Sequence, residues 1–152
     1  MKILHRFYPC NTFLSKFKEN FSSLCSFCNI EDESLLHLFY NCPHAHTFWV
    51  EVSMLIYHRF NRLIPITEEM VLFLHCVTDS HHTENAVKLC CILGKFHIHK
   101  ARVLKFIPNF HLYRNELRYL ANSMSGLTTY KKGYKTHQIL NQLLSANNIN
   151  PM

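Results

Sequence analysis

The chain has 152 residues, 48% of them hydrophobic and 13% aromatic, so it can bury a core and is not disordered by composition. Three glycines and five prolines are too few for an all-β protein rich in tight turns, and helices are therefore expected. A formal net charge of +6 fits an anionic partner such as nucleic acid, and it fits a lysine-rich solvated surface equally well.

Residues 1–24 are expected to form an irregular or partly helical lead-in. Its first ten residues do not read as a signal peptide, because His5 and Arg6 interrupt the apolar run. No stretch approaches the roughly 20 apolar residues that span a bilayer, and an odd count of seven cysteines argues against a disulfide framework. We therefore expect an intracellular protein without a membrane segment. The lead-in has solvent-facing lysines at 16 and 18 and an apolar edge formed by Phe7, Phe13, Phe17 and Phe21.

Residues 25–42, CSFCNIEDESLLHLFYNC, contain the spacing Cys-x2-Cys-x8-His-x4-Cys. Structural zinc sites use four Cys or His ligands in a tetrahedron. Cys25 and Cys28 can point inward from one tight turn, a short helical turn over SLLHLFYN can present His37, and Cys42 lies just beyond that turn. The spacing therefore predicts a zinc site with these four ligands, which pins a short segment and leaves no open position for catalysis.

Two alternatives to this ligand set stay open. Free cysteine is often buried as a small hydrophobe, so the first alternative is three core cysteines and a core histidine that meet by chance. His44 and His46 are rival fourth ligands, close after Cys42 in the sequence.

Apolar residues at helical spacing then predict a run of helices. The first begins at Pro43, a residue favoured in the first helical turn, and ends near Phe60. Others begin at a cap-like Thr67 and at about Glu84, the latter running to Phe106, and two more cover 110–124 and a segment from about 131. The predicted fold is mostly α, a small CCHC zinc knuckle followed by a helical bundle, divided into residues 1–60 and 61–152. A second metal site on the long helix is not expected from Cys90, Cys91, His97 and His99, because only Cys90 and His97 could share a face; the two cysteines are expected to pack in the core instead.

Two groups of cations are candidate contacts for nucleic acid. On the long helix, Lys88, Lys95 and Arg102 recur every seven residues, with His99 on the same face, and could track phosphates. The second group interleaves lysines with aromatic rings that could stack on unpaired bases: Tyr130, Lys131, Lys132, Tyr134 and Lys135. An ordinary solvated helix face and a flexible basic tail explain these two patterns as well.

Residues 25–49, CSFCNIEDESLLHLFYNCPHAHTFW, resemble the zinc-binding segment at the C-terminal end of reverse transcriptases from non-LTR (LINE-type) retrotransposons. That family pattern reads Cys-x2-Cys, acidic residues, a Leu-His-Leu-Phe core, Cys-Pro and a Trp a few residues later. The matching positions here are Cys25, Cys28, Glu31 to Glu33, Leu36 to Phe39, Cys42, Pro43 and Trp49. A less specific similarity continues through 92–117, so the resemblance covers about residues 20–140.

The resemblance implies zinc binding and contact with RNA or DNA that is not sequence-specific. The polymerases of this family carry an endonuclease and a reverse transcriptase ahead of the zinc segment, and 152 residues leave no room for either. Asp32 and Asp79 are the only aspartates, and neither stands in a Tyr-x-Asp-Asp motif that would hold catalytic magnesium. We therefore expect a nucleic-acid-binding remnant that is not an enzyme, with a structural or protein-interaction module as the rival class.

Overall fold

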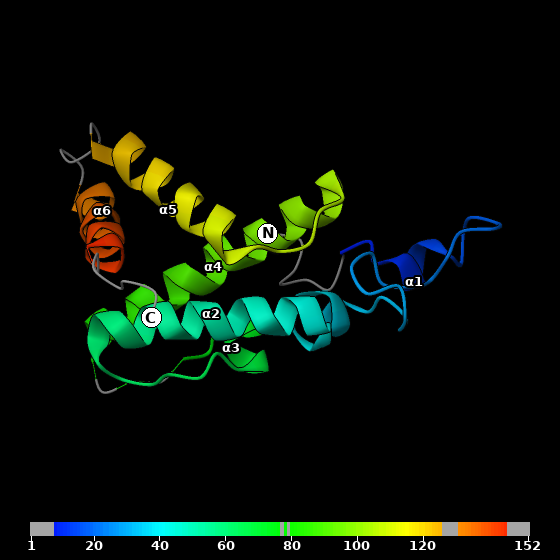
Figure 1. Ribbon diagram of the computed structural model, residues 1–152, viewed down its shortest axis with the longest axis horizontal. Helices are drawn as coiled ribbons and strands as arrows, with labels where there is room; N and C mark the ends of the chain where they lie inside the picture. Colours follow the sequence, from blue (N-terminus) through cyan, green and yellow to red (C-terminus); the bar gives the residue numbers. More distant parts are fainter. Residues whose placement is uncertain (1–7, 77, 79, 126–130, 146–152) are drawn as a thin grey trace.

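The structure is a computed structural model that describes residues 8–76, 78, 80–125 and 131–145. The described residues are mostly helical, as predicted, and contain no strand beyond an isolated antiparallel bridge between Leu24 and Asp32. None of the described helices is long and apolar enough to cross a membrane. The elements in chain order (Figure 1) are α1 Asn11–Leu14, the π-helical turn η1 His37–Asn41, α2 Pro43–Phe60, α3 Glu68–Phe73, α4 His81–Leu104, α5 Phe110–Met124 and α6 Lys131–Leu144.

Local capping explains most of the helix boundaries. Thr67 accepts a hydrogen bond from the Met70 amide and starts α3, as its position suggested. At its other end, α2 stops where Asn61 adopts a left-handed conformation. The prediction for the start of α4 was three residues late, because the Ser80 side chain caps the Thr83 amide and the helix begins at His81.

The long helices α2 and α4 run side by side through the middle of the molecule (Figure 1) and form the core together with α5 and α6. The closest approach is at Gly94 of α4, which lies under the Trp49 ring of α2. A Cβ atom added at Gly94 would lie 2.5 Å from Trp49 Cη2 and 3.3 Å from Phe48 Cε1. Only glycine therefore allows these two helices to pack at their observed separation.

Replacing Gly94 with alanine is expected to destabilise the fold, although alanine is the better helix former by about 1 kcal/mol. The added methyl overlaps a fully buried indole, and overpacking of this kind costs about 1–3 kcal/mol. Thermal unfolding monitored by circular dichroism should show a lower Tm than wild type by a few degrees, on the order of 3–6 °C. Asn85→Ala, at an exposed site of the same helix, is the control and should leave Tm within error of wild type or above it.

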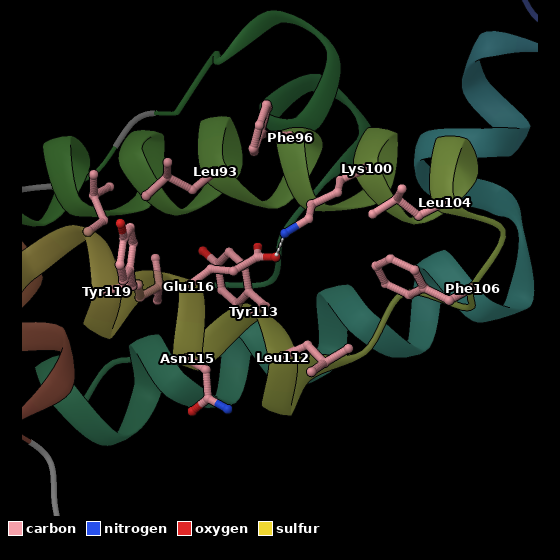
Figure 2. Close-up of a pocket in the computed structure, with 12 residues that line it drawn as sticks. Leu93, Phe96, Lys100, Leu104, Phe106, Leu112, Tyr113, Asn115, Glu116 and Tyr119 are labelled. Carbon is pink, nitrogen blue, oxygen red and sulfur yellow. Dashed lines mark hydrogen bonds and ion pairs between the residues drawn. The ribbon is translucent and has the colours of Figure 1, made fainter.

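Facing away from this core, α4 and α5 line an apolar groove of about 710 Å³ (Figure 2). Lys100 of α4 reaches across it and donates to Glu116 Oε1 of α5 at 2.9 Å. The other carboxylate oxygen of Glu116 lies 2.9 Å from Nδ1 of the buried His97, whose Nε2 accepts the Asn109 amide at 3.2 Å. These bonds fix the turn between α4 and α5. Leu112 of α5 is 46% exposed in this groove, whereas its neighbour Tyr113 is fully buried.

The segment that contains α1 lies at the opposite end of the molecule from α6 (Figure 1). It is partly helical, as predicted, but the helix is a single turn, α1. The predicted apolar edge does not pack inward: Phe13, Phe17 and Phe21 are 54%, 73% and 37% exposed. Phe7 lies outside the described residues.

Candidate metal centre

The first half of the cluster is built on a tight turn between Cys25 and Asn29. The Asn29 amide donates to the Cys25 carbonyl at 3.0 Å, and Asn29 takes a left-handed conformation with φ of 55°. The Phe27 amide donates to Cys25 Sγ at 3.4 Å, a bond that acts to lower the pKa of this thiol but is outweighed by the contact with Cys42. The turn directs Cys25 and Cys28 toward the same side, as their spacing predicts.

The second half is a π-helical turn rather than the α-helical turn that the sequence suggests. The Cys42 amide donates to the His37 carbonyl at 2.7 Å, five residues back, so the two residues stand on one face of the turn. Pro43 has no amide proton and therefore cannot donate to the Phe39 carbonyl. The Trp49 indole N–H donates to the Phe39 carbonyl instead, at 2.6 Å. This bond ties the metal-ligand turn to α2.

The ligand atoms of Cys25, Cys28, His37 and Cys42 all lie within 4.8 Å of one another. The Cys25 and Cys42 sulfurs are 3.8 Å apart, and Cys28 Sγ lies 3.4 Å from His37 Nε2. A zinc ion about 2.3 Å from each sulfur at the tetrahedral angle holds two sulfurs about 3.8 Å apart. The residues present therefore fit a tetrahedral metal ion, whereas a disulfide would need sulfurs about 2.05 Å apart.

Charge and hydrogen bonding around the ligands also suit a cation. The hydrogen bond from the Cys25 thiol to Cys42 Sγ raises the pKa of Cys25 and lowers the pKa of Cys42, so Cys42 is the readier thiolate. On the other side, His37 Nδ1 lies 3.2 Å from a Glu31 carboxylate oxygen, outside good hydrogen-bond geometry. A carboxylate beside Nδ1 favours the proton on that nitrogen and leaves the Nε2 lone pair for the metal.

Neither rival ligand joins the cluster. His44 and His46 are on the first turn of α2, where the His46 ring contacts Tyr40 at a centroid distance of 6.0 Å. Cys90 and Cys91 of the long helix pack in the core, as expected, and His97 is buried beside them; all three are at most 1% exposed.

Sequence reasoning missed a buried ion pair that attaches the cluster to α4. Glu33 is fully buried, and its carboxylate accepts from the Asn11 and Ser26 amides and the Ser26 hydroxyl, while Arg102 Nη2 lies 2.6 Å away. Arg102 also donates to the Pro9 carbonyl and stacks over Tyr8. Desolvation acts to raise the pKa of Glu33, but these hydrogen bonds outweigh it and lower the pKa below its usual value. Since Ser26 lies between two ligand positions, Glu33 holds the ligand turn onto the helix.

The predicted basic stripe on α4 is wrong as an exposed surface. Lys95 is 1% exposed because it follows Cys91 by one helical turn on the face that packs inward, and burial lowers its pKa. Arg102 pairs with Glu33, Lys88 pairs with Glu84, and His99 Nδ1 bonds the Tyr8 hydroxyl at 2.7 Å. These four residues therefore do not form a row of free cations.

The second predicted basic group lies on α6. Lys135 and Tyr134 are exposed there, the latter by 47%. Tyr130 and the side chains of Lys131 and Lys132 lie outside the described residues. α6 lies at the far end of the molecule from the metal cluster (Figure 1). The role of this group in binding nucleic acid stays a prediction.

Comparison with known proteins gives one family. No curated protein and no solved structure matches the chain. One family model matches residues 1–49, a span that contains all four clustered ligands and ends at Trp49, whose indole closes the ligand turn. Residues 1–49 match the family described as zinc-binding in reverse transcriptase, so the predicted resemblance is confirmed at the level of reverse transcriptases in general and not of their non-LTR branch.

Proposed function

We propose that the protein is a zinc-stabilised nucleic-acid-binding segment derived from the reverse transcriptase of a non-LTR retrotransposon. One observation carries the proposal: Cys25, Cys28, His37 and Cys42 converge with tetrahedral spacing inside a segment that matches zinc-binding in reverse transcriptase. With four protein ligands the coordination sphere is filled, which supports a structural and binding role rather than catalysis. Seven unpaired cysteines fit a reducing, intracellular compartment.

Zinc is the metal that we propose for this site. Three sulfurs and one imidazole in a tetrahedron suit zinc, whereas magnesium and calcium prefer oxygen ligands. The metal would stabilise the folded segment, by on the order of 10 kcal/mol in small zinc modules. The chain's own contribution is to direct the ligands, through the turn at Asn29 and the π turn at His37.

Purified protein is expected to contain one zinc ion per chain by elemental analysis. Substitution with Co²⁺ should give the intense visible absorption of tetrahedral sulfur-rich coordination, because geometry and ligand type set that spectrum. His46→Ala should leave both measurements unchanged, since His46 stands outside the cluster. Protein without metal, or with an octahedral cobalt spectrum, would contradict the ligand assignment.

Nucleic-acid binding rests on where the charge lies. Residues 43–152 hold twelve of the sixteen Lys and Arg and six of the ten acids, so the whole net charge of +6 comes from this part of the sequence. Since two cations of the α4 group are engaged inside the fold, we assign phosphate contact chiefly to Lys131, Lys132 and Lys135 of α6. Tyr134 beside them offers a ring for stacking.

The protein is expected to bind RNA or DNA without sequence preference, with an affinity that falls as salt rises. Each phosphate contact on a single strand contributes about 0.7 to the slope of log affinity against log salt. Changing all three α6 lysines to alanine should flatten that slope by roughly two units and weaken every sequence alike. Filter binding at several salt concentrations measures this, with the exposed acid pair changed in Glu68→Gln and Glu69→Gln as a control that should not flatten the slope.

The second candidate is an interaction module in which zinc only holds the fold. The observation in its favour is that Arg102 and Lys95, central to the predicted phosphate-binding stripe, serve internal contacts or lie buried. The same titration separates the two candidates. Absence of RNA and DNA binding at low salt, by protein that holds zinc and is folded, favours the interaction module.

A further inference from the structure

Residues 13–21 form an exposed arm in which aromatic rings alternate with lysines. Phe13, Phe17 and Phe21 are 54%, 73% and 37% exposed, and Lys16 and Lys18 between them face solvent. The Phe13 and Phe17 rings are 5.0 Å apart by centroid, and Lys18 Nζ lies 5.7 Å from the Phe21 ring. The arm thus presents two neighbouring rings and a cation–aromatic pair on one short stretch.

This arm is attached to the metal centre at its base. The Thr12 hydroxyl donates to the Glu33 carbonyl at 2.8 Å, and the Asn11 side-chain amide donates to the Leu24 carbonyl at 2.7 Å. Asn11 also accepts from Arg102 at 3.0 Å. The base of the arm is therefore fixed to both the ligand turn and α4, while the segment beyond it extends away from the helices (Figure 1).

Three exposed phenylalanines within nine residues contribute less to the fold than core rings do, because a ring contributes only to the extent that water is excluded from it. Rings paired with cations offer two kinds of contact at once. A base can stack on the face of an aromatic ring, and lysine can approach the phosphate that follows it. Duplex bases offer their faces only to one another, so this combination recognises unpaired nucleotides.

We infer that residues 13–21 are a stacking platform for unpaired nucleotides of RNA or DNA, centred on Phe17. This inference rests on the proposed nucleic-acid function and names a second contact surface, remote from the lysines of α6 (Figure 1). The platform supplies sequence-tolerant stacking at the metal-binding end, and α6 supplies charge at the other end. A single strand that engages both would run along the length of the molecule.

The test compares Phe17→Ala with Phe17→Trp in filter binding to single-stranded RNA, single-stranded DNA and a duplex. Loss of one stacking partner is expected to lower affinity for single strands between about 5-fold and 100-fold with an unchanged salt slope. Phe17→Trp should bind at least as tightly as wild type. Lys16→Ala with Lys18→Ala should instead flatten the slope by about 1.4 units.

Phe73→Ala is the matched control, since Phe73 is an exposed phenylalanine on α3, 56% accessible, outside the arm. Every variant must hold as much zinc as wild type, which shows that the ligand turn is intact. If wild type binds single strands and Phe17→Ala binds them equally well, the platform is refuted and the proposed function stands. Equal wild-type affinity for duplex and single strand also refutes the platform. If wild type binds no nucleic acid at low salt, the proposed function fails and the platform with it.

Discussion

Cys42→Ser is expected to abolish metal binding and to unfold residues 23–42 while α4 and α5 stay folded. A zinc module of this size draws on the order of 10 kcal/mol from the metal, and a serine hydroxyl is a poor replacement for the thiolate. The backbone bonds within the segment are local ones: the Leu24–Asp32 bridge with its neighbouring pairs, the turn at Asn29 and the π turn at His37. Leu38 and Phe39 of the segment belong to the same buried core as the helices, but most of that core comes from residues after Pro43, so we expect the helices to stay packed.

Hydrogen exchange resolved by segment measures this outcome. Amides of residues 23–42 should exchange at nearly unprotected rates in Cys42→Ser, and amides of α4 and α5 should keep most of their protection. Cys76→Ser is the matched control, a buried cysteine outside the cluster, and should leave the metal content at the wild-type level. Wild-type protection over residues 23–42 in the metal-free variant would mean that packing alone folds this segment.

Arg102→Met is expected to lower the free energy of unfolding by about 3–5 kcal/mol, because it leaves the Glu33 carboxylate buried without its countercharge. Methionine keeps the apolar stem of the side chain and its contact with Tyr8. Urea denaturation of the zinc-loaded protein measures the loss. The double variant Glu33→Gln with Arg102→Met removes both charges and should recover a large part of it.

The pH dependence provides an independent check on the same pair. Since the pKa of Glu33 is lowered in the folded state, its contribution to stability is present above its unfolded pKa of about 4.5 and is lost as pH falls through the folded value. Without Arg102, desolvation is less opposed, so the loss should begin at higher pH than in wild type. Parallel acid profiles for wild type and Arg102→Met would argue against a coupled pair.

Periodicity and spacing predicted the features that depend on neighbours in sequence. The bounds of α2 and α5 could be predicted because Pro43 and the apolar stripes are local signals, and the ligand set followed from Cys-x2-Cys-x8-His-x4-Cys. The prediction of an exposed basic stripe was wrong because seven-residue spacing indicates that Lys88, Lys95 and Arg102 share a face of the helix. It does not indicate whether that face is turned to solvent or to the core. Glu33 and Arg102 are 69 positions apart, and only the tertiary fold brings them together.

The π turn at His37 was also beyond sequence reasoning, since α and π turns differ by one residue in hydrogen-bond register and SLLHLFYN suits both. What selects the π turn here is visible only in three dimensions. Trp49 supplies the donor that the Phe39 carbonyl lacks next to Pro43, and the wider turn aligns His37 with Cys42.

The indole bond to the Phe39 carbonyl also gives the molecule an intrinsic optical reporter. Trp49 is the only tryptophan of the chain, 2% exposed, with its ring on Gly94 of α4 and its N–H on the last turn of the metal-ligand segment. Its emission maximum depends on how much water reaches the ring. Chelation of the metal should shift the emission maximum to longer wavelength, and unfolding in urea should shift it further. The size of the shift would therefore distinguish release of the ligand segment from unfolding of the helices.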